Sequence, residues 1–168
     1  MPAQKILLYP HPLLKKLARP VAAIDDEILG LVNDLLDTMR DGPGSVGVAA
    51  PQIGVSLRVC VVDVSSNRHG RENNHGLLVL INPEIMDREG SAIMREGCMS
   101  VPDYTGDVER ATRITVRFTD ETGTSREVDA SGFEAVALQH EMDHLDGVLF
   151  LDRIASLKTG LFRRKNYR

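Results

Sequence analysis

The most regular pattern of apolar residues lies between positions 28 and 39. Apolar side chains recur there every three or four residues, which places them on one face of a helix: Ile28, Leu31, Val32, Leu35, Leu36 and Met39. Asp25 precedes this run as a potential N-cap, and two acidic residues follow it at the positive end of the helix dipole. The pattern predicts an amphipathic helix that acts as scaffold.

Other apolar runs have the continuity or the alternation of β-strands. A nearly continuous run at 58–64 predicts a buried strand that contains Cys60. Strict alternation at 113–119 predicts a half-buried strand, and residues 125–129, which follow a turn, are its expected hairpin partner. These segments indicate sheets with at least one face in the core.

Two further segments predict strands on either side of a proline. Residues 77–82 read as a strand that Pro83 closes, and residues 84–94 read as one or two more. The polar segment 65–76 before them is expected to be an exposed loop, and its two histidines are more simply solvated than metal-bound.

A run of small residues at 41–54 contains four glycines. Small residues let a backbone come close to a ligand or to another strand. A phosphate-binding loop is disfavoured because no Gly-Lys-Ser/Thr ending is present. Composition alone therefore predicts a plain loop, in which Gln52 is the side chain able to donate a neutral hydrogen bond into a site.

A second helix is expected in the C-terminal third of the chain. Ser131 and Glu134 have the spacing of a capping box, and Gly147 is suited to end the helix. Within this helix His140 and His144 lie one turn apart on the same face, where two imidazoles can bind one metal ion.

The residue after the first histidine adds a candidate base to this pair. Glu141 would lie beside the metal, where its carboxylate can take a proton from an activated water. A bare His-Glu-x-x-His pattern also occurs by chance in long helices, in which case it is a surface helix with two ordinary histidines. The remaining ligands decide between these interpretations.

The length and composition indicate a single domain over residues 1–168. The formal charge of −4 argues against a mainly nucleic-acid-binding surface. Two cysteines are too few for a disulfide framework, the N-terminal residues lack the pattern of a targeting peptide, and no apolar run approaches the roughly 20 residues that cross a bilayer. We therefore expect a cytoplasmic protein with no membrane span.

The chain after the second histidine offers no third metal ligand. Phe150 stands where the metzincin pattern has a third histidine, and no glutamate follows Glu141, as a thermolysin-like site would require. Both absences count against a broader metallopeptidase. The third ligand must come from upstream, where the candidates are several carboxylates and five other side chains: Cys98, Cys60, His11, His69 and His75.

Cys98 is the strongest of these candidates. It lies between Gly97 and a strand-breaking Ser-Val-Pro, where a backbone can approach a metal closely and present a thiolate. Cys60 lies among valines and lacks that setting. A site with one cysteine and two histidines has three protein ligands and one open position, which is typical of a catalytic metal.

Three stretches resemble, in order and spacing, the three motifs of the peptide deformylase family: Ser-Val-Gly-Val-Ala-Ala-Pro-Gln at 45–52, Glu-Gly-Cys-Met-Ser at 96–100 and Gln-His-Glu-Met-Asp-His at 139–144. The similarity extends from residue 9 to residue 147. The family usually has glycine at position 45 and leucine at positions 48 and 99, and many members have an arginine at the position of Thr105.

The resemblance implies a hydrolase that removes the N-formyl group from the formyl-methionine of newly synthesised polypeptides. It implies one divalent metal, Fe²⁺ in cells and replaceable by Zn²⁺, Ni²⁺ or Co²⁺, with three ligands: Cys98, His140 and His144. It implies that Glu141 is the base and that the Gln52 side chain and the Met99 backbone N–H donate to the developing oxyanion.

Three apolar residues share the face of the metal helix that carries the first histidine: Phe133, Val136 and Ala137. Most residues of this kind belong to a core, but this face must also border the open metal position, so we favour an apolar pocket for a flexible side chain such as methionine. The resemblance implies further substrate-binding residues: Val46, Gly47, Met94, Glu96 and Gly97.

The predicted fold is α+β, with antiparallel or mixed sheets around the C-terminal metal helix and the N-terminal helix outside.

A basic tail at the C-terminal end could touch ribosomal RNA, although a solvated segment is the favoured interpretation. Its residues are Lys158, Arg163, Arg164, Lys165 and Arg168. The alternative function is a non-catalytic or altered-specificity metalloprotein of the same fold. Glu141 and Gln52 argue against it, because metal binding alone needs neither.

Overall fold

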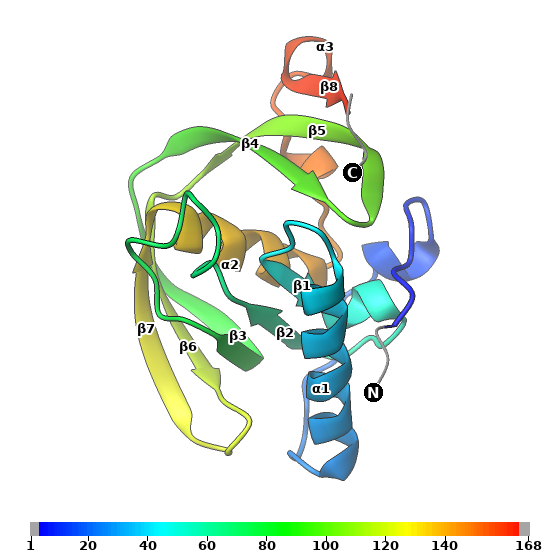
Figure 1. The fold of residues 1–168 in the computed structure, drawn as a ribbon, viewed down its shortest axis with the longest axis vertical. Coiled ribbons are helices and arrows are strands. Elements are labelled where there is room, and N and C mark those ends of the chain that lie inside the picture. Colours follow the sequence, from blue (N-terminus) through cyan, green and yellow to red (C-terminus); the bar gives the residue numbers. More distant parts are fainter. Residues whose placement is uncertain (1–3, 165–168) are drawn as a thin grey trace.

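The computed structural model describes residues 4–164 as two antiparallel sheets with one helix between them (Figure 1). The five-stranded sheet has the order β1-β2-β3-β6-β7, and the three-stranded sheet has the order β4-β5-β8. The elements in chain order are η1 (Pro12–Lys15), α1 (Asp26–Asp41), β1 (Gly47–Ala49), η2 (Ala50–Ile53), β2 (Val59–Val62), β3 (Leu78–Glu89), β4 (Ala92–Cys98), β5 (Val101–Arg110), β6 (Arg113–Thr119), β7 (Ser125–Ser131), α2 (Gly132–Leu145), η3 (Phe150–Arg153), α3 (Leu157–Gly160) and β8 (Leu161–Arg163).

The amphipathic helix predicted from the first apolar pattern is confirmed as α1. The Asp25 side chain accepts a hydrogen bond from the backbone N–H of Ile28, which caps the helix as expected. The buried face of α1 packs on one face of the five-stranded sheet, through residues that include Val59 and Val61 of β2. The helix therefore supports the sheet from outside, away from the histidine pair.

The other face of the same sheet packs against α2. Cys60 and Val62 alternate with the residues that face α1, and they join a core with Leu138 and Met142 of the helix. Both faces of β2 are covered, which explains why its sequence is continuously apolar. The predicted α+β arrangement, with the histidine helix at the centre, is confirmed.

Two loop and strand predictions were wrong. The glycine-rich segment is not a plain loop, because Gly47 to Ala49 form the edge strand β1, paired with β2. Pro83 does not close the preceding strand, since β3 continues through it to Glu89. Asn82 has φ of 52° and the pairing with β6 shifts register there, so an irregularity of the β-bulge kind accommodates the proline.

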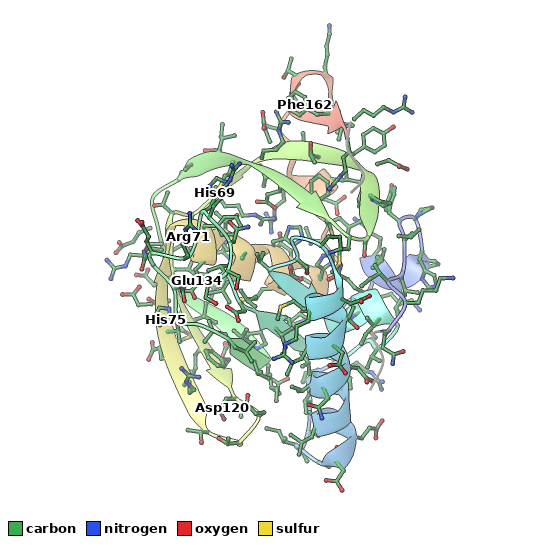
Figure 2. All side chains as sticks on the ribbon, in the orientation of Figure 1. His69, Arg71, His75, Asp120, Glu134 and Phe162 are labelled. Atoms are coloured by element: carbon green, nitrogen blue, oxygen red, sulfur yellow. The ribbon has the colours of Figure 1, made fainter. Side chains whose placement is uncertain are left out.

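The predicted capping box at the start of α2 was also wrong. Ser131 is the N-cap residue, but its side chain makes no capping bond and instead accepts from Asn73. Glu134 turns away to the loop, where it accepts from the backbone N–H of His75 at 2.7 Å and lies 2.5 Å from the ring Nδ1 (Figure 2). His75 is exposed and is not one of the converging ligand residues, as expected, but its bonds to Glu134 also anchor the loop 65–76 to the helix.

Glycine is required at the C-terminal end of α2. Gly147 has φ of 73°, and a Cβ there would lie 2.6 Å from the Lys15 carbonyl oxygen. Its N–H donates to His144, so the chain turns directly after the helix, as the sequence predicted. Within residues 4–164 no helix combines the length and apolar character needed to cross a membrane.

Candidate metal centre

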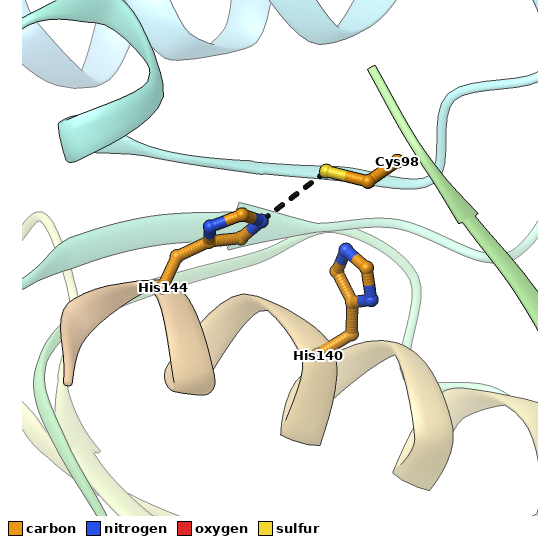
Figure 3. A group of neighbouring side chains, drawn as sticks. All are labelled: Cys98, His140 and His144. Carbon is orange, nitrogen blue, oxygen red and sulfur yellow. Dashed lines mark hydrogen bonds between the residues drawn. The ribbon is translucent and has the colours of Figure 1, made fainter. Parts of the chain in front are cut away.

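Three side chains converge where the end of β4 meets the C-terminal half of α2 (Figure 3). The potential ligand atoms of Cys98, His140 and His144 all lie within 4.8 Å of one another, and the three residues are buried. Cys98 Sγ is 3.4 Å from Nε2 of His144. The helix supplies both imidazoles from one face, as the four-residue spacing requires.

Cys98 reaches this position because β4 ends there. The pairing with β5 is regular up to Gly97 opposite Thr105, and then shifts so that Cys98 lies opposite Val101. The resulting tight turn brings the cysteine inward. Cys60, the weaker candidate, lies in the sheet core, where burial raises the pKa of its thiol well above the usual value.

A buried carboxylate orients the first histidine. Nδ1 of His140 donates to Oε1 of Glu96 at 2.9 Å, which leaves Nε2 for a metal. Arg110 also binds both oxygens of Glu96, at 2.5 and 2.9 Å. Burial acts to raise the pKa of Glu96, but the bonds from His140 and Arg110 outweigh it, so the pKa is lowered and the carboxylate stays charged.

The charged network continues beyond Glu96 to the protein surface. Arg110 donates to Asp143 at 2.8 Å, and Asp143 accepts two further bonds from Arg153 of η3. Sequence reasoning missed Arg110, Asp143 and Arg153 as site residues. Arg110 and Arg153 carry no local signal, because each is a lone arginine whose partners are distant in the chain.

Glu141 lies beside the ligands with one oxygen free. Its Oε1 is buried and has no hydrogen-bond partner within the described chain, and burial raises the pKa of the carboxyl to about 7. A Cβ at Gly47 would lie 2.9 Å from Oε2, so glycine at this position allows β1 to pass directly over the carboxylate.

The Gln52 amide is held in one orientation. Its Oε1 accepts from the backbone N–H of Ala49 at 3.0 Å, so its Nε2 faces the site, 3.1 Å from Ser100 Oγ and 3.5 Å from Cys98 Sγ. The N-terminal segment connects the segment that carries Gln52 to the turn that carries Ser100. The N–H of Leu7 donates to the carbonyl of Gln52, and the N–H of Tyr9 donates to the carbonyl of Ser100. The amide donor is thus fixed before any ligand binds.

A cavity of about 470 Å³ opens beside the ligands. Its lining includes most of the sequence-predicted substrate-binding residues: Val46, Gly47, Glu96, Gly97, Phe133, Val136 and Ala137. Met99 and Gln52 also line it, whereas Met94, half-buried on β4, does not. Arg164 lines the cavity too, although the sequence placed it in a solvated tail.

The donor set fits a divalent transition metal. One thiolate and two imidazoles are the ligands that iron, zinc, cobalt and nickel accept, and three protein ligands leave a coordination position open. A buried carboxylate and an amide donor stand beside that position. Together the fold and the site define a metal-dependent hydrolase with a buried carboxyl group beside the metal position.

Residues 3–160 match the sequence profile of the family described as polypeptide deformylase, so the chain belongs to that family. It is therefore a metal-dependent enzyme that removes the formyl group from the N-terminal formyl-methionine of newly made polypeptides. The resemblance of the three motifs is confirmed.

Individual relatives are similar to this protein in sequence and structure over nearly the full chain. A peptide deformylase of Alkalilimnicola ehrlichii is 50% identical over 160 residues, which cover 95% of this chain and 86% of that protein. A crystal structure of the Legionella pneumophila enzyme has a TM-score of 0.84 at 42% identity, with 93% and 88% of the two chains covered. An Acinetobacter baumannii deformylase bound to Met-Ala-Ser has a TM-score of 0.83 at 34% identity, with 90% and 98% covered.

Proposed function

We propose that this enzyme deformylates its substrates with one divalent metal held by Cys98, His140 and His144. The observation that carries the proposal is the convergence of these three side chains beside the buried Glu141, at one end of an apolar cavity. A metal bound by these ligands would act as a Lewis acid that lowers the pKa of water towards neutrality. All other steps depend on side chains and backbone groups of this chain.

Glu141 takes the proton from the water that attacks the formyl carbon. Its free Oε1 is available for this, and the same carboxyl then delivers the proton to the departing amine nitrogen. The C–N bond of the formamide breaks, so that the products are formate and a peptide with a free N-terminal methionine. Gly47 keeps the backbone close to Glu141, which restrains the position of the carboxylate.

Two donors serve the oxyanion that develops on the formyl oxygen. They are Nε2 of Gln52, oriented by Ala49, and the backbone N–H of Met99 in the turn after Cys98. The first side chain of the substrate enters the apolar part of the cavity beside Phe133, Val136 and Ala137. The Met-Ala-Ser complex of the Acinetobacter relative supports a methionyl peptide as ligand.

The substrate assay uses formyl-Met-Ala-Ser and acetyl-Met-Ala-Ser, with release of the free amine as the readout. We expect cleavage of the formyl peptide and very slow cleavage of the acetyl peptide, because a methyl group must then fit between the base and the metal site. Equal rates on both peptides, or hydrolysis of the Met-Ala bond, would contradict the proposal.

Replacing Gln52 by leucine tests the oxyanion donor. We expect kcat to fall about 100-fold, because loss of one such donor costs on the order of 3 kcal/mol. Metal content is measured in parallel, since Nε2 also lies near Cys98. Full metal occupancy with less than a threefold loss of kcat would show that Gln52 is not a donor in the reaction.

The resident metal in cells is expected to be Fe²⁺. A Cys-His-His site accepts several divalent ions, so metal availability decides which is bound. Enzyme purified without oxygen should contain about one iron per chain, lose activity on chelation, and regain it with Ni²⁺, Co²⁺ or Zn²⁺ to different extents. Full activity of the metal-free enzyme would be the contrary result.

The whole of residues 1–168 is proposed to act as one catalytic domain in the cytoplasm, where formyl-methionyl chains are made. Cell fractionation tests the location.

Contact of the basic tail with the ribosome is the less favoured proposal. Lys158 and Arg163 are exposed, Arg164 lines the cavity, and Lys165 and Arg168 lie outside the described residues. Pelleting with ribosomes at two salt concentrations distinguishes contact from a solvated tail.

A further inference from the structure

The C-terminal strand brings one arginine to the substrate cavity. Strand β8 pairs with β5, so that Phe162 lies opposite Thr105, and the N–H of Arg164 donates to the Asp103 carbonyl at 2.8 Å (Figure 1). The Arg164 side chain lines the cavity together with Gly97 of β4. A cation at the end of β8 is therefore part of the cavity wall.

Arg164 lies on the face of the three-stranded sheet that points away from the metal ligands. Side chains alternate along β4, so Glu96 and Cys98 face α2 while Arg95 and Gly97 face the opposite way. On that outer face Arg95 stacks over the ring of Phe162 at 3.5 Å. A Cβ at position 97 would lie only 2.5 Å from Nη2 of Arg164, so glycine leaves room for the guanidinium.

The charge of Arg164 has no counterpart in the described part of the chain. Arg95 pairs with Asp107 at 3.0 Å, and Arg110 pairs with Glu96 and Asp143. By contrast, no carboxylate of residues 4–164 pairs with Arg164, and its Nε is buried without a hydrogen-bond partner. A half-buried guanidinium with free donors is suited to bind an anionic group of a ligand.

The direction in which an extended substrate peptide would lie indicates which anionic group Arg164 would bind. Strands β1 and β4 are edges of their sheets, and both border the cavity. The first substrate side chain points towards α2, so the second side chain of an extended peptide points the opposite way, onto the face that carries Gly97 and Arg164. The guanidinium of Arg164 occupies the place of a side chain at position 97, so it borders the path of that second side chain.

We infer that Arg164 binds a carboxylate on the second residue of the substrate, so that the enzyme prefers formyl-methionyl chains whose second residue is Asp or Glu. The inference rests on the proposed function for the direction of the peptide. Arg164 contributes two donors in a plane, which matches a carboxylate, and its partly buried position limits screening by water. No step of the chemistry depends on it.

The test compares formyl-Met-Glu-Ser amide with formyl-Met-Gln-Ser amide, which differ by one charge and lack a C-terminal carboxylate. For the wild type at low salt we expect kcat/KM to be about fivefold higher for the Glu peptide, mainly through KM, as for a partly exposed ion pair. Arg164→Gln should bring this ratio to about one, Arg164→Lys should retain part of it, and Arg164→Glu should reverse it.

Arg163→Gln is the matched control, because Arg163 is exposed on the same strand and its side chain points to the other face. It should keep the wild-type ratio. A wild-type ratio of one, a ratio that survives in Arg164→Gln, or an equal loss on both peptides would overturn the inference. If the wild type does not deformylate the Gln peptide at all, the proposed function fails instead.

Discussion

Replacing Glu141 by glutamine is expected to lower kcat by about 10²- to 10⁴-fold, because general acid–base catalysis by a positioned carboxylate contributes that much. Glutamine has nearly the same size and keeps the contact with Gly47, but it cannot take a proton from water. Turnover of formyl-Met-Ala-Ser measures the effect.

The metal content of this variant is the necessary control. Glu141 is not one of the three converging ligands, so Glu141→Gln should bind metal as the wild type does. A matched variant that loses a ligand, Cys98→Ala, should instead lose the metal together with activity. Activity that survives in metal-loaded Glu141→Gln would show that another group moves the proton.

Replacing Arg110 by methionine is expected to destabilise the fold by about 3–5 kcal/mol, because removal of one partner leaves buried charges without compensation. The side chains of Arg110 and Glu96 are 3% and 6% exposed, and Asp143 also depends on this guanidinium. Urea unfolding of the metal-loaded proteins measures the loss.

Arg113→Met is the matched control for Arg110→Met. Arg113 forms an ion pair with Asp129 on neighbouring strands, but both side chains are about half exposed, at 54% and 49%. Solvent screens such a pair, so its loss should change stability little. If the two variants unfold at the same urea concentration, burial does not strengthen the Arg110 network.

Loss of Arg110 should also affect the metal site. Glu96 holds His140 through Nδ1, and Arg110 holds Glu96 in place. We therefore expect Arg110→Met to bind metal more weakly than Arg113→Met, since partners behind the ligands typically contribute 10- to 100-fold in affinity. A series of ion pairs and hydrogen bonds, from Arg153 through Asp143, Arg110 and Glu96 to His140, thus connects the protein surface to the histidine ring.

Patterns of residues within short segments were sufficient to predict much of the fold. The apolar spacing of Ile28 to Met39 predicted α1, and the alternation in Arg113 to Thr119 predicted β6 with the same bounds. The histidine pair and Glu141 depend only on helical geometry, so their relative placement followed from the sequence. Cys98 was identified by its setting and by the lack of any ligand downstream.

Other features depend on residues that are far apart in the chain. The capping box at Ser131 failed because Glu134 meets His75, 59 positions earlier, and a local motif cannot show which distant partner will compete. The bulge at Asn82 likewise depends on the pairing of β3 with β6. Local propensity favoured a break at Pro83, and sheet pairing overrode it.

The sequence by itself placed His140, Glu141 and His144 together on one helix, because their arrangement depends on spacings of a few residues in regular structure. Cys98, on a separate strand, was selected from its setting in the sequence. Only the tertiary structure decided that Arg110 holds Glu96 and that Arg164 reaches the substrate cavity. Arg110 reaches Glu96 across the paired strands β5 and β4, although their pairing partners are Ala92 and Gly106, and the pairing of β8 with β5 brings Arg164 to the cavity. Side-chain contacts across paired strands leave no local pattern in the sequence, so neither arginine could be assigned to the site from its neighbours in the chain.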